Sequence, residues 1–265
     1  MTEKPEMLEK IDVHLTDHCN LNCQGCTHFS PLAQEFYLDL QDFKNDIGRL
    51  AALTGAKLGQ MFLLGGEPLL HPQLTQFFQI AREFFPNTQI IIITNGILLP
   101  EQPDEFWLAC KKSNIRIWVS LYRLKIDYET IDARAKQFGV FCGYTGTRTN
   151  EEHKKDWGSW KLDKDGQQYW ADAFTYCKVK NCVTLKKGKL YTCPTIAHIE
   201  HLNKYFGLNF EVTPYDYIDI YKIRNHQAIL DTMVKPVPFC RYCKTRSFEK
   251  CVWAPTKRDV SEWVS

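Results

Sequence analysis

The sequence predicts an α/β fold in which five to six parallel strands form a partial (β/α) barrel of the TIM type, followed by a smaller C-terminal domain. Through the first half of the chain, strand-like segments alternate with helix-like segments, and such alternation favours a parallel sheet with right-handed crossovers. Near residue 145 the alternation gives way to a polar stretch that contains several tryptophans. We therefore predict one domain over residues 1–150 and a second over residues 151–265.

The elements of the first domain follow one another in a regular order. An alternating strand is expected at residues 11–15, and a buried strand at residues 61–64 is ended by Gly65 and Gly66. Further strands are expected at residues 89–93, 115–121 and 139–144. Helices with an apolar stripe are expected between them, beginning near Asp39, after Pro72, near Phe106 and after a capping Asp127.

The second half of the chain has fewer periodic segments. Residues 183–192 are typical of a β-hairpin with a Lys-Lys-Gly turn, and a helix is expected between about residues 218 and 233. Residues 145–176 show no clean periodicity. Their tryptophans (Trp157, Trp160 and Trp170) either line a substrate or form a packed lid, since tryptophans in a loop serve both purposes.

The composition is that of an ordinary globular protein. The chain has 265 residues, of which 44% are hydrophobic and 24% charged. Its first residues are charged, which argues against a signal peptide, and the apolar run at residues 90–93 is far too short to span a bilayer. Eleven cysteines without an export signal indicate metal ligation in a reducing compartment. We expect a cytoplasmic protein with no membrane partner.

The net charge of +2 argues against a dedicated nucleic-acid binder. The charge is unevenly distributed, because residues 145–265 hold 20 Lys and Arg against 14 Asp and Glu, whereas residues 1–144 hold 13 against 17. An ordinary solvated surface is the simpler explanation of this balance. An anionic small-molecule substrate, such as a phosphorylated sugar, is the alternative.

The most informative motif is the run Cys19-x3-Cys23-x2-Cys26, which brings three thiolates together from one loop. Structural metal sites are closed by four ligands, whereas a [4Fe–4S] cluster with three protein ligands keeps one iron open for a substrate or cofactor. The loop also follows the first expected strand, at the barrel edge where reactive groups of such folds gather. The motif therefore indicates catalytic chemistry.

This motif, followed after the next strand by Gly65-Gly66-Glu67-Pro68, resembles the radical S-adenosylmethionine (SAM) superfamily over roughly residues 8–145. The resemblance implies that the open iron binds SAM, which is cleaved to methionine and a 5′-deoxyadenosyl radical. In that scheme the glycines let the backbone approach the methionine amino group. Glu67 offers an acceptor nearby, and Pro68 stiffens the strand exit.

The resemblance also implies cofactor contacts at the next two strand ends. Thr94 and Asn95 correspond to the contact on the ribose side, and Ser120 is expected to bond the cofactor carboxylate or ribose, with a solvated strand end as the alternative. One departure is visible. The residue before the third cysteine is often aromatic in the family, whereas this chain has Gly25, so an adenine contact must come from elsewhere.

A second group of cysteines resembles the auxiliary-cluster domain called twitch, the half-sized form of SPASM. Its pattern implies one auxiliary [4Fe–4S] cluster, with Cys193, Cys240 and Cys243 as ligands and Cys177 preferred over Cys182 as the fourth. A zinc site is the alternative, because four thiolates with one C-x2-C spacing also suit zinc. Cys110 and Cys142 lie in apolar patterns and are expected in the core.

Two of the remaining thiols are candidate catalytic residues. Cys251 and Cys182 are hydrogen-atom donors if the enzyme is an epimerase, and inert buried thiols otherwise. Three histidines (His14, His18 and His28) flank the first motif. His28 could reach the active site, although a solvated or structural role is the simpler expectation. Tyr122 is a further candidate to line the substrate.

The resemblance favours an enzyme that abstracts hydrogen from a small polar molecule, with dehydrogenation or epimerisation of a sugar or aminocyclitol-like substrate preferred. In the dehydrogenation case the auxiliary cluster accepts the second electron. The resemblance further implies an external reductant such as flavodoxin or ferredoxin. One alternative is a maturase acting on a peptide or protein, which the short lead before the first strand disfavours. The other is a non-catalytic Fe–S electron carrier or redox sensor, which has no need for the Gly-Gly-Glu-Pro turn.

Overall fold

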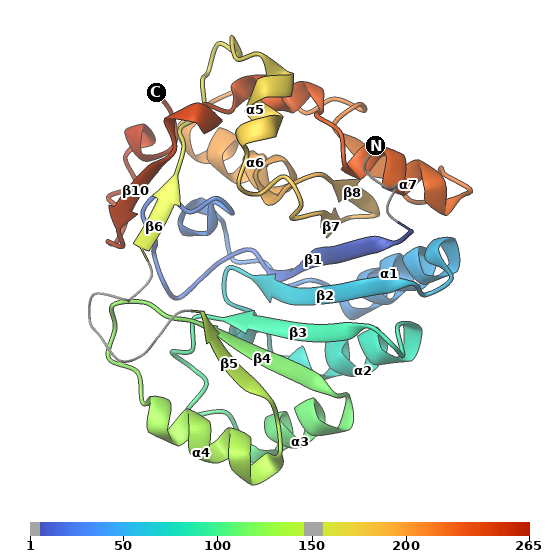
Figure 1. Ribbon diagram of the computed structural model, residues 1–265. Coiled ribbons are helices and arrows are strands. Elements are labelled where there is room, and N and C mark those ends of the chain that lie inside the picture. The colour runs from blue at the N-terminus through green and yellow to red at the C-terminus, as the bar shows by residue number, and fades with distance from the viewer. Residues whose placement is uncertain (1–5, 146–155) are drawn as a thin grey trace.

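The computed structural model describes residues 6–145 and 156–265, without the side chains of residues 156–158 and 251. One eight-stranded sheet runs through it in the order β5-β4-β3-β2-β1-β7-β8-β9 (Figure 1). The first six strands in this order are parallel, whereas β8 pairs antiparallel with β7 and β9 pairs antiparallel with β8. The sheet stays open, which confirms the predicted α/β class with six parallel strands. The strands are β1 (Leu8–Thr16), β2 (Leu58–Gly65), β3 (Gln89–Thr94), β4 (Ile115–Ser120), β5 (Cys142–Thr145), β7 (Thr184–Lys186), β8 (Lys189–Tyr191) and β9 (Tyr217–Asp219).

The crossover helices contact one another in succession along the sheet (Figure 1). Asp39 caps α1 by accepting from the main-chain N–H of Gln41 and Asp42, and Asp127 caps α4 by accepting from that of Thr130. Both caps supply acceptors for helix N–H groups that have no partner inside the helix. The helices are α1 (Leu40–Thr54), α2 (Leu74–Phe84), α3 (Asp104–Lys112) and α4 (Tyr128–Phe138).

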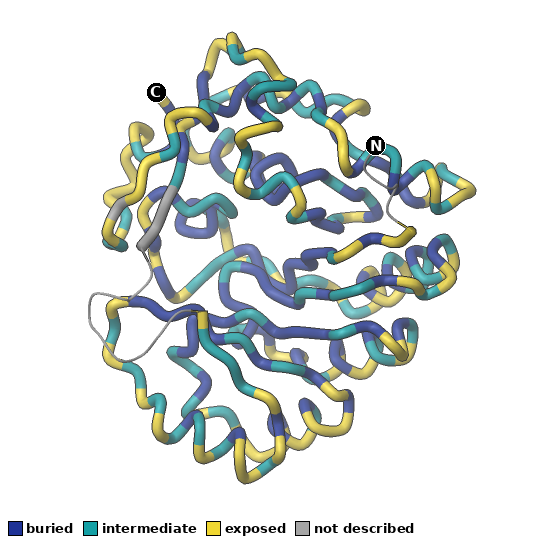
Figure 2. Tube along the Cα trace, viewed as in Figure 1, coloured by how far each residue is buried: buried dark blue, intermediate teal, exposed yellow. Residues whose placement is uncertain are grey.

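Two large hydrophobic cores, beside a small cluster around Leu21 and Tyr122, stabilise the described part of the chain. The larger lies between the sheet and these helices, where side chains such as Phe77, Ile92 and Trp107 are fully buried. The smaller is formed by C-terminal segments around Leu202 and Phe239. Figure 2 shows the central strands as buried and the outer turns of the helices as exposed. Apolar burial of this kind is the main driving force for folding.

The C-terminal half packs directly on the sheet, because β7 pairs with β1 through Asp12–Thr184 and Val13–Leu185. Its longer helices are α5 (Trp170–Tyr176), α6 (Pro194–Phe206) and α7 (His226–Met233). A two-stranded antiparallel ribbon of β6 (Asp156–Ser159) and β10 (Glu249–Val252) lies beside the loop that follows β1 (Figure 1). Short 3-10 helices are η1 (Ser30–Leu32), η2 (Pro68–Leu70), η4 (Pro238–Tyr242), η5 (Thr245–Ser247) and η6 (Val260–Glu262).

The helix expected over residues 218–233 is wrong in its first half. The segment begins with β9, and only residues 226–233 are helical. The guanidinium of Arg49, on α1, donates hydrogen bonds to the carbonyls of Ile220 and Ile223 at 2.8 and 2.6 Å. These carbonyls therefore accept from a side chain and not from a helix N–H. Asn225 then caps α7. Helices α5 and α6 were not predicted from the sequence.

The helices in the described ranges are all too short or too polar to cross a lipid bilayer.

Candidate functional site

The three cysteines of the first motif surround one cavity of about 140 Å³ at the carboxyl edge of the parallel strands. Its walls come from the loop after β1 and from the ends of β2, β3 and β4, so strand ends far apart in the sequence meet there. The residues that line it are Cys19, Leu21, Cys23, Cys26, Thr27, His28, Ser30, Leu64, Gly65, Gly66, Ile93, Thr94, Asn95, Ser120 and Tyr122.

The cysteine loop turns sharply between its second and third thiols. Gly25 adopts φ 62°, in the left-handed region that favours glycine. This requirement explains why the position does not carry the aromatic residue that the family resemblance leads one to expect. The loop thus gains its turn at the expense of a side chain that could contact an adenine.

A second set of contacts holds this loop from the far end of the sequence. We call residues 253–256 together with Trp263 the C-terminal strap. The main-chain N–H of Gln24 donates to the carbonyl of Ala254 at 2.9 Å. The indole N–H of Trp253 donates to the sulfur of Cys23 at 3.2 Å, and that of Trp263 donates to the carbonyl of Cys26 at 3.0 Å. The strap therefore fixes both the backbone and a thiol of the loop.

The three thiols of the first motif are suited to bind a cationic group. Burial raises the pKa of Cys19, and the nearby Glu67, Cys26 and Cys23 raise it further. Three thiolates this close together need positive charge to compensate them, which the irons of a cluster supply. The donor set of Cys19, Cys23 and Cys26 thus fits a [4Fe–4S] cluster with one open iron.

The two glycines of the Gly-Gly-Glu-Pro turn lie where β2 comes very close to the end of β1. Gly66 N–H donates to the Thr16 carbonyl at 2.9 Å, and Glu67 N–H donates to the His18 carbonyl at 3.1 Å. A Cβ at either glycine would collide with main-chain atoms of this neighbouring segment. The absence of a side chain is therefore needed for strand packing, while both glycines also line the cavity.

The carboxylate of Glu67 is engaged in hydrogen bonds within the protein. It accepts from the Thr94 hydroxyl at 2.7 Å and from the main-chain N–H groups of Asn95 and Leu69 at 2.8 and 3.0 Å. Burial raises the pKa of Glu67 to about 7, although these hydrogen bonds oppose the rise. The side chain ties the end of β2 to the end of β3. Neither Glu67 nor Pro68, which opens η2, lines the cavity.

Asn95 links the third strand end to the cysteine loop. Its amide Nδ2 donates to Asn20 Oδ1 at 2.7 Å and lies 3.8 Å from the sulfur of Cys19. Ser120, at the end of β4, is buried and faces the same cavity. Of the residues predicted to contact SAM, five (Gly65, Gly66, Thr94, Asn95 and Ser120) therefore line one cavity with the three cysteines.

A second cavity of about 20 Å³ is lined by four of the remaining cysteines. Cys177 follows α5, Cys193 precedes α6, and Cys240 and Cys243 belong to η4 and its end. All four line this cavity. Burial raises the pKa of Cys240 to about 11 and that of Cys193 and Cys243 still further, so these thiols would need a bound cation to be held as thiolates.

The structure separates Cys182 from both groups. Its sulfur lies 3.4 Å from the ammonium of Lys10, near the amino end of β1, and it lines neither cavity. The geometry therefore favours Cys177 as the fourth auxiliary ligand. A hydrogen-atom donor at Cys182 stays a prediction that gains no support from this position. The side chain of Cys251 lies outside the described part, and the expected core positions of Cys110 and Cys142 agree with their packing.

Sequence reasoning missed several residues near the site. Trp253 and Trp263 gave no signal, because their partners lie more than 200 residues away. A buried polar group around Asp17 and His198 was missed for the same reason. His18 Nδ1 accepts from the main-chain N–H of Phe36 at 3.2 Å, which is a structural role as expected, whereas His28 lines the cysteine cavity.

The fold and this centre together define a partial-barrel protein whose parallel strands end at a three-cysteine site. Residues 13–137 match the radical SAM superfamily, so the chain contains a radical SAM domain. The chain is 36% identical over 99 residues to the GTP 3′,8-cyclase of Synechocystis sp., covering 37% of this chain and 29% of that protein. It is 32% identical over 142 residues to the GTP 3′,8-cyclase of Streptomyces coelicolor, covering 52% and 40%.

Among solved structures, the chain is similar to BtrN in complex with AdoMet and 2-DOIA, with a TM-score of 0.53 and 17% identity over 90% of this chain and 93% of that one. This similarity shows a shared fold. The curated relatives are matched over less than half of their own length, so the likeness to them concerns the radical SAM domain.

Proposed function

We propose that the protein is an enzyme that cleaves SAM reductively and abstracts a hydrogen atom from a small polar substrate. The observation that carries this proposal is the single cavity shared by three cysteines and the ends of β2, β3 and β4. Only a site of this kind can hold an open cluster beside a cofactor. An electron carrier has no need for an open iron, nor for strand ends that converge on it.

In this proposal Cys19, Cys23 and Cys26 would hold a [4Fe–4S] cluster with one open iron, which together with SAM would supply the radical chemistry. The chain's own residues position the cysteine loop and enclose the space for the cofactor. Asn95 braces the loop through Asn20, and Glu67 fixes the strand ends that carry Thr94 and Gly66. Ser120, Thr94 and the main chain at residues 65–66 supply polar groups to the cofactor space.

We further propose one auxiliary [4Fe–4S] cluster held by Cys177, Cys193, Cys240 and Cys243, in a twitch-like domain over residues 151–265 that follows a core over residues 1–150. The four thiols share one buried cavity, which supports this ligand set over one with Cys182. A cluster with four protein ligands suits outer-sphere electron transfer. Its place in the reaction would be to accept the second electron of a dehydrogenation.

The substrate class rests on the fold. The similar structure is a complex with AdoMet and 2-DOIA, which supports a small sugar- or aminocyclitol-like molecule over a peptide. The curated relatives favour a second candidate, a nucleotide such as GTP. The net positive charge of residues 145–265 is compatible with an anionic substrate of that kind.

The enzyme proposal is tested by measuring 5′-deoxyadenosine in anaerobic, iron-loaded protein reduced with dithionite. We expect slow formation by the wild-type chain and none by Cys26→Ala, since two thiolates do not hold the cluster. The matched control is Cys110→Ala, a buried core cysteine of α3 outside both cavities. Wild-type protein with a filled cluster that forms no 5′-deoxyadenosine would refute an enzyme and favour an electron carrier.

The auxiliary ligand set is tested by counting iron. Two clusters correspond to about eight irons per chain, and we expect Cys243→Ala to hold about four while Cys182→Ala keeps about eight. Cys243→Ala should still form 5′-deoxyadenosine but yield no oxidised product. Zinc in place of iron in anaerobically purified protein, or a loss of iron in Cys182→Ala, would contradict this assignment.

A further inference from the structure

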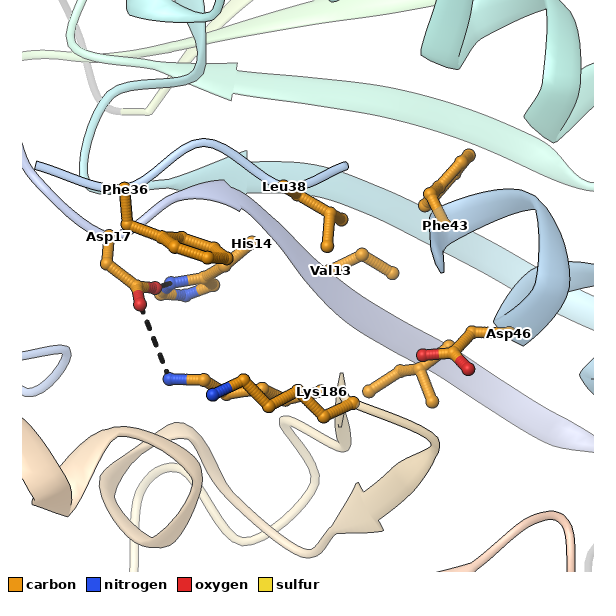
Figure 3. A pocket seen from close by; sticks show the side chains of 10 residues that line it. Val13, His14, Asp17, Phe36, Leu38, Phe43, Asp46 and Lys186 are labelled. Carbon is orange, nitrogen blue, oxygen red and sulfur yellow. Dashed lines mark hydrogen bonds and ion pairs between the residues drawn. The ribbon is translucent and has the colours of Figure 1, made fainter. Parts of the chain in front are cut away.

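A buried polar cluster lies beside the cysteine loop and takes no part in the function proposed above. It is formed where the carboxyl end of β1, the hairpin strand β7 and the helix α6 meet. His14, Asp17 and His198 are buried, and Lys186, Glu200 and His201 surround them. Figure 3 shows His14 and Asp17 on one side of a small pocket, with Lys186 reaching toward Asp17 from the other.

Several polar atoms of this cluster have no hydrogen-bond partner among the described residues. They are both ring nitrogens of His14, Oδ1 of Asp17, Nε2 of His198 and Nε2 of His201. An unpaired polar atom in the protein interior is unfavourable, and each such group in a native fold calls for an explanation. Because Nδ1 of His14 and Oδ1 of Asp17 are neighbours, these two unpaired atoms indicate a missing partner that they share.

The spacing of these atoms matches that of ligands around one ion. Asp17 Oδ1 lies 3.6 Å from Nδ1 of His14 and 3.5 Å from Nδ1 of His198. Both distances are too long for good hydrogen bonds. Around a tetrahedral ion with bonds of about 2.1 Å, neighbouring ligand atoms are separated by about 3.4 Å. The imidazole rings of His14 and His198 are stacked with centroids 3.8 Å apart, which holds them side by side.

We propose that His14, Asp17 and His198 bind a divalent transition-metal ion, with zinc as the preferred ion. Two imidazoles and one carboxylate form a donor set that zinc accepts in proteins. His201 Nε2 lies 3.2 Å from the other oxygen of Asp17, so it orients the carboxylate from outside. Burial lowers the pKa of both His14 and His198 and keeps them neutral, the form that binds metal.

Lys186 is the competing cation at this site. Its ammonium lies 3.0 Å from Nδ1 of His198, 3.4 Å from Asp17 Oδ2 and 2.9 Å from Glu200 Oε1. It therefore balances the charge of Asp17 when no ion is bound. Glu200 is more than half exposed, and the lysine can withdraw toward it when an ion takes its place. Removal of Lys186 should strengthen metal binding for this reason.

The ion would join two parts of the chain that carry the two cysteine sites. His14 and Asp17 belong to β1 and the segment that leads directly to Cys19, whereas His198 lies in the helix that follows Cys193. A bond from each to one ion would fix the position of the three-cysteine loop relative to the auxiliary cysteines. The metal therefore acts as a structural clasp between the two sites.

The test uses the full chain with its iron–sulfur sites filled anaerobically, so that the thiols are already occupied. The protein is dialysed against buffered free Zn²⁺, and zinc and iron are both counted by elemental analysis. We expect one zinc per chain in wild-type protein and at least a tenfold loss of affinity in His198→Ala. Lys186→Met should bind at least as tightly as wild type. His226→Ala, a half-buried histidine of α7, is the matched control and should bind as wild type does.

Four outcomes would overturn the proposal. Wild-type protein that binds no zinc overturns it, whatever Lys186→Met does. So does zinc retained at full stoichiometry by His198→Ala. Zinc lost from Cys243→Ala but kept by His198→Ala shows a thiolate site instead. The Lys186→Met variant keeps the test sharp if His198→Ala does not fold, because a gain of affinity cannot arise from misfolding; weaker binding by that variant would equally contradict the proposal.

Discussion

Single side chains at the cysteine cavity adjust the site through hydrogen bonds. Trp253 donates its indole N–H to the sulfur of Cys23, and Glu67 accepts three hydrogen bonds that hold two strand ends. Neither residue needs to contact a substrate for its substitution to have a measurable effect. The effects differ, because one acts on the electronic environment of a ligand and the other on stability.

Trp253→Phe should lower the reduction potential of the first cluster. A hydrogen bond to a ligand sulfur stabilises the reduced, more negative state, and about 1 kcal/mol of such stabilisation corresponds to roughly 40 mV for one electron. The potential is measured by EPR-monitored redox titration. Trp170→Phe, a half-exposed residue of α5, is the control. An unchanged potential in Trp253→Phe would show that the bond does not tune the cluster.

Glu67 should give the protein a pH-dependent stability. Because burial raises the pKa of Glu67 from 4.5 to about 7, the folded state binds its proton more tightly than the unfolded state. Stability contributed by this group is therefore present below the unfolded pKa and is lost as pH rises to about 7, by about 3 kcal/mol at most. Histidines whose pKa burial lowers, such as His14 and His198, act in the opposite direction.

The contribution of Glu67 is isolated by comparison with Glu67→Gln, which cannot titrate. The difference in free energy of unfolding between wild type and Glu67→Gln is measured by urea denaturation at pH 5 and pH 7. We expect wild type to lose stability relative to the variant as pH rises. A constant difference across this range would show that Glu67 titrates normally.

At the scale of elements, the site depends on how closely two strands approach. The end of β2 lies against the end of β1 without room for a side chain at Gly65 or Gly66. This contact sets the position of the loop that carries the three cysteines, and the C-terminal strap fixes the same loop from its other side. The loop is held between two elements that are distant in sequence.

Gly66→Ala should displace the cysteine loop, because its Cβ would collide with the main-chain carbonyl of His18. Overpacking of this kind costs about 1–3 kcal/mol, and we expect iron content to fall by about half, since the auxiliary site is untouched. Gly48→Ala on α1, whose neighbour is the movable ring of Phe84, is the control with unchanged iron. Full iron content in Gly66→Ala would mean that the loop adapts at no cost.

Elements with strong local signals were predictable from sequence. The helix capped by Asp127 and the hairpin over residues 183–192 both appear as expected, because their caps, turns and apolar periods act within a few residues. The helix α6 was missed, since residues buried on several sides, including Ile196, His198 and Leu202, hide its amphipathic period. Convergence of the cysteines with strand ends followed from topology, whereas Trp253 and His198 needed the tertiary structure.

At the scale of the whole molecule, one sheet joins both predicted domains. Strand β7 pairs with β1, and the His14–Asp17–His198 cluster lies across the same junction. The segments that carry the two cysteine sites are thereby connected through one continuous sheet. The predicted division into two domains at residue 150 can be tested, because β7 of the second domain pairs with β1 of the first.

Residues 1–150 expressed alone should fail to form a stable monomer. Without β7, the strand β1 becomes an exposed edge with unpaired N–H and C=O groups, which promotes aggregation, and Leu185 no longer covers the sheet. Size-exclusion chromatography and urea unfolding of the fragment beside the full chain provide the measurement. A monomeric fragment with cooperative unfolding would show that the first domain is autonomous.

The bond between Trp253 and Cys23 joins residues 230 positions apart, and this separation has a consequence in time. At ribosomal rates of roughly 5–20 residues per second, on the order of 10 to 50 seconds pass between synthesis of the first motif and synthesis of its anchor. During that interval the three thiols emerge on a nascent chain that cannot yet hold them in place. The thiols are then exposed to oxygen and to other metal ions. The yield of protein with an intact three-cysteine site should therefore depend on how anaerobic the cell is during translation.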